Sequence, residues 1–217
     1  MARFDTFVFD LDGTLLDTLP DLVVLTNAAL NEQGFPSRTA DEIHSFVGNG
    51  ARALMYQAVP ADASPEQAEA AMRRWMELYP VIGNKLTKPY PHMEETLAAL
   101  AQRGIGLGVL SNKFDQGVHD VIDAYLPGLF PVQYGECDEI PRKPDPTGLL
   151  RCIDELIRTS PHGVRGRFAG DVLVSRNAGA FAIGVSWGYH HADALRKAGA
   201  DVVIEDAREL LQFAVER

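Results

Sequence analysis

Polar residues that can perform phosphoryl chemistry stand where apolar segments of the chain end. They are Asp10 and Asp12 after FVF, Ser111 and Asn112 after GLGVL, Lys143 in the loop RKPDP, and Asp171 after FAG. Carboxylate oxygens suit Mg²⁺, which binds few protein carboxylates and keeps water and phosphate as its other ligands. A lysine and a hydroxyl can neutralise the remaining phosphate oxygens. The set therefore predicts a site for a divalent cation and a phosphoryl group.

The two aspartates have complementary roles in such a site. Asp10 can attack phosphorus as a carboxylate nucleophile. Asp12 can protonate the leaving oxygen and then deprotonate water for the second half-reaction. An Asp-Gly pair also favours turns, but a turn alone does not account for the polar groups at the other segment ends.

The elements that must position these residues follow an alternating pattern. Phe4–Phe9 is short, apolar and β-prone, which predicts a buried strand. Beyond residue 82, helical and strand-like segments alternate, which predicts a parallel sheet covered on both faces. Ligands of such sheets bind outside the carboxyl ends of the strands. Strands are expected at 105–110, near Val132, at 167–169, 181–186 and 201–204, and helices at 94–102, 116–125, 146–157, 192–197 and 207–214.

The segment between the first strand and the rest of the sheet is expected to be helical. Apolar residues recur at helical spacing before Gly34, which is a candidate C-cap. Further helices are expected over 41–58 and 64–79, the second with Ser64 as its N-cap. The predicted fold class is therefore α/β, a Rossmann-like doubly wound parallel sheet with an inserted α-helical domain. The predicted domains are residues 1–16 with 83–217 for the core, and 17–82 for the insert.

Composition excludes several classes of function. The net charge of −10 argues against binding to nucleic acid or to an anionic membrane surface. It does not exclude a small anionic substrate, which needs only a few local cations or a metal. We find no apolar run of bilayer length and no signal-peptide pattern. Cys137 and Cys152 form neither a disulfide framework nor a zinc motif, and a reducing cytoplasm is the simplest interpretation.

The motifs DLDGT, SN and KPDP, in this order, resemble the haloacid dehalogenase superfamily of phosphatases. The resemblance covers essentially the whole chain. The helical insert, the segment FVGNGARALM and the segment TKPYPHMEETLAALAQRG resemble the phosphoglycolate phosphatase-like branch, which has a helical cap after the first strand. The insert is therefore expected to be a cap that opens and closes over the site and excludes water during chemistry.

The resemblance implies a role for each residue of the core motifs. Asp10 would be the nucleophile and a Mg²⁺ ligand, and Asp12 the general acid/base, with its backbone carbonyl on the metal. Ser111 and the Asn112 backbone would bind the phosphoryl group, although both could merely cap the helix that follows. Lys143 would hold the nucleophile and the phosphate together. Two further assignments complete the set: Gly13 as a phosphate contact and Asp171 as a metal ligand.

Asn49, Gly50 and Arg52 begin a helix of the expected cap and are candidate substrate contacts. The glycine could equally permit a bend. The arginine could be an ordinary surface charge, so both interpretations stay open at this point.

The fourth motif is shorter than the family pattern, which has GD, three residues and a second acid. In GDVLVSRNAGA no acid follows Asp171 until Asp193. If GD sets the register, the second acid is lost. If D-x4-R-N-A-G sets it, which matches more residues, Asp171 is the second acid and about four residues before it are deleted. In both registers a carboxylate is missing, which should weaken Mg²⁺ binding by about 1–3 kcal/mol if it leaves a polar contact unmade.

We therefore predict a Mg²⁺-dependent phosphatase that hydrolyses a small phosphomonoester through an aspartyl-phosphate, with phosphoglycolate as the family-level expectation and sugar phosphates next. Dehalogenases lack an acid at the position of Asp12. Phosphonate hydrolases need a cap lysine, and residues 17–82 contain none. Two alternatives stay open: a sugar-phosphate mutase, and a catalytically weakened or non-enzymatic phosphate-binding protein. A cytoplasmic monomer or homodimer is expected.

Overall fold

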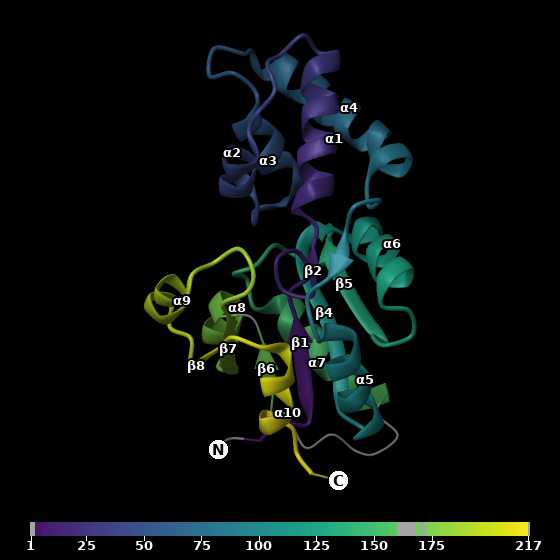
Figure 1. Ribbon diagram of the computed structural model, residues 1–217, viewed down its shortest axis with the longest axis vertical. Helices are drawn as coiled ribbons and strands as arrows, with labels where there is room; N and C mark the ends of the chain where they lie inside the picture. The colour runs from purple at the N-terminus through teal and green to yellow at the C-terminus, as the bar shows by residue number, and fades with distance from the viewer. Residues whose placement is uncertain (1–2, 160–167, 171, 217) are drawn as a thin grey trace. The chain divides into compact units, whose positions relative to one another are not determined.

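The computed structural model describes residues 3–159, 168–170 and 172–216 (Figure 1). The chain divides into two compact units, Met1–Leu16 with Pro89–Arg217 and Asp17–Lys88. Within the described ranges, no helix is long and apolar enough to cross a membrane.

The first unit is built on a parallel sheet. Its described strands are β1 (Thr6–Phe9), β4 (Gly106–Phe114), β5 (Val132–Glu136), β6 (Phe168–Gly170), β7 (Phe181–Val185) and β8 (Val202–Ile204). Their order is β5-β4-β1-β6-β7-β8, and neighbouring strands run parallel. The predicted α/β fold class is confirmed. Strand β1 lies between β4 and β6, so residues that follow these strands are brought to one edge of the sheet.

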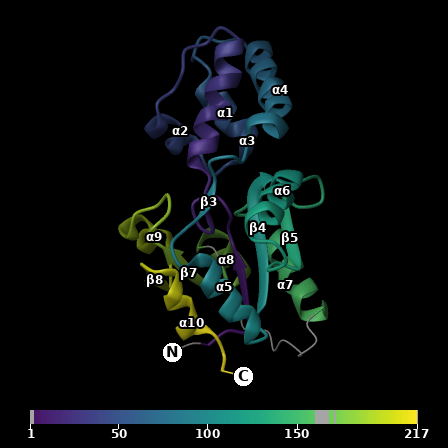
Figure 2. The ribbon, with the colours of Figure 1, turned by 45° about the vertical axis from the view of Figure 1, so that its right-hand side comes forward.

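Helices cover both faces of this sheet (Figures 1 and 2). Their bounds are α5 (Met93–Gln102), α6 (Asp115–Tyr125), α7 (Thr147–Thr159), α8 (Val172–Ala178), α9 (Ala192–Ala198), η1 (Ala207–Glu209) and α10 (Leu210–Phe213). Side chains alternate along a strand, and Phe7 and Phe9 pack with apolar residues of α5, α6 and α10. Val8 packs on the other face with residues of α7 and α8. A strand buried on both faces explains the continuous apolar run of β1.

The second unit is helical. Its helices are α1 (Leu19–Glu32), α2 (Ala40–Phe46), α3 (Gly50–Ala58) and α4 (Pro65–Ile82). The predicted N-cap is confirmed, because the Ser64 hydroxyl accepts a hydrogen bond from the Gln67 N–H. Trp75 of α4 is buried and donates from Nε1 to Thr26 Oγ1 of α1 over 3.3 Å. Gly34 follows α1 with a positive φ of 76°, as expected for a residue that ends a helix.

The prediction of one helix over 41–58 is wrong. The chain leaves the helix after Phe46 and begins a new one at Gly50. Gly48 and Gly50 have φ values of 118° and 81°, a backbone conformation that glycine adopts readily and that interrupts an α-helix.

The boundary after the helical unit lies at residue 88 and not at the predicted residue 82. The buried Asp21 carboxylate accepts hydrogen bonds from the backbone N–H groups of Lys85, Leu86 and Thr87 and from the Thr87 hydroxyl, over 2.6 to 3.0 Å. These bonds tie residues 85–87 to α1. The chain then passes between the units in the short strand pair β2 (Leu16–Asp17) and β3 (Lys88–Pro89).

Replacing Asp21 with Asn is expected to destabilise the protein. An amide has one acceptor oxygen where the carboxylate has two, so part of the N–H set at 85–87 loses its partner. A buried polar group without a partner costs about 1–3 kcal/mol, and urea unfolding should show a loss of this size. Asp62→Asn, at an exposed position, is the control. Unchanged stability of Asp21→Asn would contradict the assignment of Asp21 as the anchor of this segment.

Candidate active site

The loop that carries the two aspartates turns sharply after β1. Gly13 N–H donates to Leu16 O over 2.9 Å, and Leu15 N–H donates to Leu11 O over 3.1 Å. Asp10 Oδ1 accepts a hydrogen bond from the Leu11 N–H over 2.8 Å, which fixes the orientation of that carboxylate.

Each aspartate is paired with a buried lysine. Lys143 Nζ lies 2.8 Å from Asp10 Oδ1, and only 7% of the lysine side chain is exposed. Lys113 Nζ lies 3.5 Å from Asp12 Oδ1, and 5% of its side chain is exposed. A buried charge is stable only when it is paired, so the two lysines offset the two carboxylates. The sequence prediction included Lys143 but gave no role to Lys113; its place directly after Ser111 and Asn112 was the available signal.

Ser111 and Asn112 lie inside β4, which continues past the predicted end at residue 110 to Phe114. Both are buried. The alternative in which they cap the next helix is not supported: the N-cap of α6 is Phe114, with no side-chain cap hydrogen bond. The Ser111 hydroxyl accepts a hydrogen bond from the Lys113 N–H over 3.2 Å. Ser111, Asn112 and Lys113 are thus consecutive residues near the carboxyl end of β4.

The loop after β7 packs directly against the loop that carries Asp10 and Asp12. Trp187 Nε1 donates a hydrogen bond to Thr14 O over 3.0 Å, which joins the two loops. Gly13 has φ +74°, and a Cβ there would lie 2.5 Å from the Tyr189 ring. A Cβ on Gly188 would lie 1.6 Å from Gly13 O. Gly188 is required by the close approach of the two backbones, and Gly13 by its positive φ and by the Tyr189 ring that packs on it.

The predicted metal site is described only in part, because Asp171 lies outside the described residues. Asp10 and Asp12 offer carboxylate and carbonyl oxygens, which are the ligands that Mg²⁺ prefers. The described residues contain no group of three or more His, Cys, Asp or Glu side chains arranged to hold a metal. The donor chemistry that is described fits the predicted ion, and the assignment stays a prediction.

The candidate substrate contacts Asn49, Gly50 and Arg52 lie at the start of α3 in the helical unit, with Asn49 as the N-cap. Arg52 forms an ion pair with Glu69 of α4, at 2.5 Å from Nη1 to Oε2 and 3.2 Å from Nη2 to Oε1. The Tyr56 hydroxyl donates to the same carboxylate over 2.9 Å. The hydrogen bond from Arg52 holds the pKa of Glu69 below its usual value. A role in substrate contact stays a prediction for all three residues.

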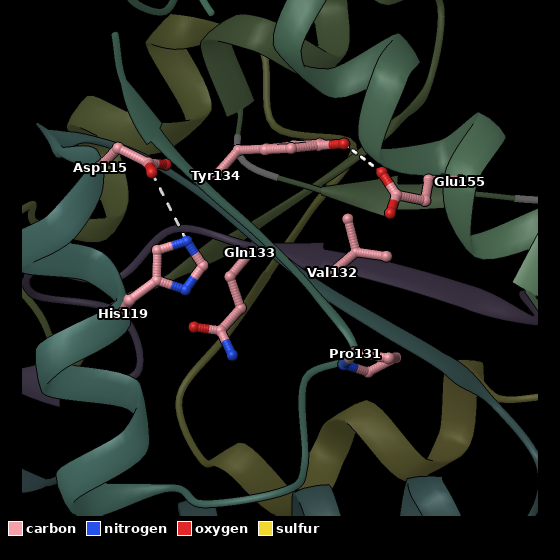
Figure 3. A pocket seen from close by; sticks show the side chains of 7 residues that line it. All are labelled: Asp115, His119, Pro131, Val132, Gln133, Tyr134 and Glu155. Atoms are coloured by element: carbon pink, nitrogen blue, oxygen red, sulfur yellow. Dashed lines mark hydrogen bonds and ion pairs between the residues drawn. The ribbon is translucent and has the colours of Figure 1, made fainter.

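A surface pocket of about 290 Å³ lies elsewhere on the first unit, at the β5 edge of the sheet (Figure 3). It is lined by Asp115, His119, Pro131, Val132, Gln133, Tyr134 and Glu155. The Tyr134 hydroxyl donates to Glu155, and burial together with this carboxylate raises the pKa of Tyr134. The pocket contains no predicted site residue. The candidate active site is identified by the polar residues at the carboxyl ends of the strands, and not by this pocket.

Comparison with known proteins identifies the family of the chain. A family profile described as "Haloacid dehalogenase-like hydrolase" matches residues 7–183. The chain belongs to the haloacid dehalogenase-like hydrolase family. It is 32% identical over 223 residues to a phosphoglycolate phosphatase of Vibrio cholerae serotype O1, covering 99% of both chains. It is 33% identical over 215 residues to that of Vibrio vulnificus, covering 95% of this chain and 94% of the relative.

A solved structure of this family has the same fold. The crystal structure of "a predicted phosphoglycolate phosphatase" from Haemophilus somnus 129pt has a TM-score of 0.85 and 26% identity, and covers 98% of each chain. The predicted family, its phosphoglycolate phosphatase-like branch, and the enzyme class of phosphoric monoester hydrolases are confirmed. The roles of individual site residues stay predictions.

Replacing Gly13 with Ala is expected to lower kcat by about 100-fold, because a misplacement of about 1 Å in a catalytic group can have this effect. The matched control is Gly128→Ala. Gly128 has the same φ of +74°, but a Cβ there meets nothing within 4 Å. Steady-state kinetics and thermal unfolding of both variants separate the contact with Tyr189 from backbone strain. Equal kcat values for the two variants would show that the contact is unimportant.

Proposed function

We propose that the chain is a Mg²⁺-dependent phosphatase that hydrolyses a small phosphomonoester through an aspartyl-phosphate on Asp10. The observation that supports it best is the 2.8 Å pair between Asp10 Oδ1 and Lys143 Nζ, just beyond the end of β1. A nucleophile and a cation in contact at a strand end are what phosphoryl transfer requires. The family and the names of the curated relatives point in the same direction.

The reaction would proceed in two displacements. A carboxylate oxygen of Asp10 attacks phosphorus, the bond from phosphorus to the leaving oxygen breaks, and Asp12 gives its proton to that oxygen. Water then attacks phosphorus and gives a proton to Asp12. The bond between phosphorus and Asp10 breaks, inorganic phosphate leaves, and both carboxyl groups return to their starting states.

Other residues would stabilise the charge that develops on the phosphoryl oxygens. Lys143 would neutralise one of these oxygens, and Ser111 and the Asn112 backbone would donate hydrogen bonds to others. Gly13 would allow the loop backbone to approach the phosphate. Bound Mg²⁺, held by the Asp10 carboxylate, the Asp12 carbonyl and Asp171, would supply further positive charge to the phosphoryl group.

The substrate is proposed to be a small phosphorylated metabolite. Phosphoglycolate comes first, because relatives at 32% and 33% identity are named phosphoglycolate phosphatases. Sugar phosphates come next. The net charge of −10 supports the absence of nucleic-acid and membrane partners. A cytoplasmic monomer or homodimer is part of the same proposal.

The shortened fourth motif is the feature that favours a catalytically weakened or non-enzymatic protein. The retained Asp10–Lys143 and Asp12–Lys113 pairs oppose that alternative, because buried charge pairs seldom add stability on their own account. A sugar-phosphate mutase would contain the same pairs and would transfer the phosphoryl group to a second hydroxyl with little release of phosphate.

The proposed function predicts phosphate release from phosphoglycolate and from an aryl phosphate. Release should require Mg²⁺ and disappear in Asp10→Asn, because an amide is not a nucleophile for phosphorus. Asp123→Asn, at an exposed position of α6, is the control and should keep its activity. Absence of release from the unmodified chain at high Mg²⁺, across many phosphate esters, would reject hydrolysis. Transfer to an added hydroxyl would indicate the mutase.

Replacing Arg52 with Ala tests the proposed substrate contact. Loss of one charge-assisted hydrogen bond to a phosphorylated substrate should raise KM for phosphoglycolate by about tenfold or more. The pair with Glu69 is solvent-exposed and should contribute little to stability, so thermal unfolding should change little. Arg73→Ala, at an exposed position of α4, is the matched control. An unchanged KM in Arg52→Ala would assign Arg52 to the surface ion pair alone.

A further inference from the structure

The backbone of Lys143 is held at two points by one side chain. Asn112 Oδ1 accepts a hydrogen bond from the Lys143 N–H over 2.7 Å. Asn112 Nδ2 donates to the Lys143 carbonyl oxygen over 3.3 Å. Asn112 is itself buried in β4. The amide therefore fixes the backbone of Lys143 to the strand that carries Ser111.

A second asparagine holds the next residue of the same loop. Asn177 Nδ2 donates to the Pro144 carbonyl oxygen over 2.7 Å. Asn177 lies in α8, in the part of the fourth motif that is retained as R-N-A-G. Side-chain amides from two elements, β4 and α8, thus meet the loop at adjacent residues.

This loop needs external support because it has little structure of its own. Residues 141–146 belong to no helix or strand, and the Asp145 N–H bond to Arg142 O, at 3.1 Å, is a local turn contact. The lysine side chain has four rotatable bonds and substantial conformational entropy. Its ammonium can stay within hydrogen-bond distance of Asp10 only if the backbone from which it extends is held in place.

We propose that Asn112 and Asn177 are positioning residues, whose side-chain amides fix the Lys143–Pro144 backbone and thereby set the Lys143 ammonium against Asp10. The catalytic consequence rests on the proposed phosphatase function. The inference gives the Asn112 side chain a role beyond the phosphate contact expected of its backbone. It also gives the retained half of the fourth motif a role that does not depend on the missing carboxylate.

Turnover of an aryl phosphate provides the first test. Asn112→Ala should lower kcat by about 100-fold, and Asn177→Ala, which removes a single hydrogen bond, by about tenfold. In a Lys143→Met background the ammonium is absent, so adding Asn112→Ala should lower kcat by no more than about twofold. A purely structural role would instead give the same fold-loss in both backgrounds, which would overturn the proposal.

The chain offers a matched control for the two hydrogen bonds between the Asn112 side chain and the Lys143 backbone. In the helical unit, Asn27 Nδ2 donates to Arg38 O over 2.9 Å, and Asn27 Oδ1 accepts from Arg38 N–H over 2.7 Å. Asn27→Ala removes the same two bonds from a backbone segment that carries no predicted catalytic group. Its kcat should stay within about twofold of the unmodified chain, while its melting temperature falls as in Asn112→Ala.

Crystal structures of the unmodified chain, Asn112→Ala and Asn177→Ala provide a test that does not depend on turnover. The distance from Lys143 Nζ to Asp10 should increase beyond hydrogen-bond range in both variants. An unchanged ion pair after loss of the amide contacts would overturn the proposal. If the unmodified chain releases no phosphate but the variants lose the pair, the proposed function fails and the positioning role stands.

Discussion

Pairing of two buried lysines with two aspartates, two residues apart after a buried strand, is the interaction on which this site depends. A buried lysine charge is stable only when a group of opposite charge lies close by. Lys143 and Lys113 meet this requirement, each with one carboxylate. One lysine comes from a loop and the other from β4, so the charge balance requires that distant parts of the chain be held to the same sheet edge.

The parallel sheet satisfies that requirement through strand order. β1 pairs with β4 on one side and β6 on the other, so the carboxyl ends of three strands are adjacent. The apolar side chains of β1 anchor this edge on both faces, Phe7 and Phe9 on one and Val8 on the other. Burial of each large side chain contributes about 1.5–3 kcal/mol, which makes the strand a rigid support for the loop that follows.

The residues of the candidate site are held in place by close packing of two loops and by side-chain amides. Gly13 and Gly188 let the loop that carries Asp10 and Asp12 and the loop after β7 come together, and Trp187 adds a hydrogen bond to Thr14 O. Asn112 holds the backbone of Lys143 in a comparable way. Lys143, which lies on a loop, is thus held by a side chain that belongs to a regular element.

The sequence by itself determined the α/β class and the Ser64 cap, and it predicted Asp10, Asp12, Ser111 and Lys143 as a phosphoryl-transfer set. These follow from local properties: apolar periodicity, capping chemistry and residue type at strand ends. Only the tertiary structure decided the helix break before Gly50 and the boundary at residue 88. It alone also decided the ion pair of Lys113 with Asp12 and the hydrogen bonds of the Asn112 side chain to the Lys143 backbone. The ion pair and these hydrogen bonds join side chains to groups on other loops or strands, and the boundary depends on bonds from Asp21 to residues more than 60 positions away. Such contacts arise from the folded geometry, which periodicity and composition do not encode.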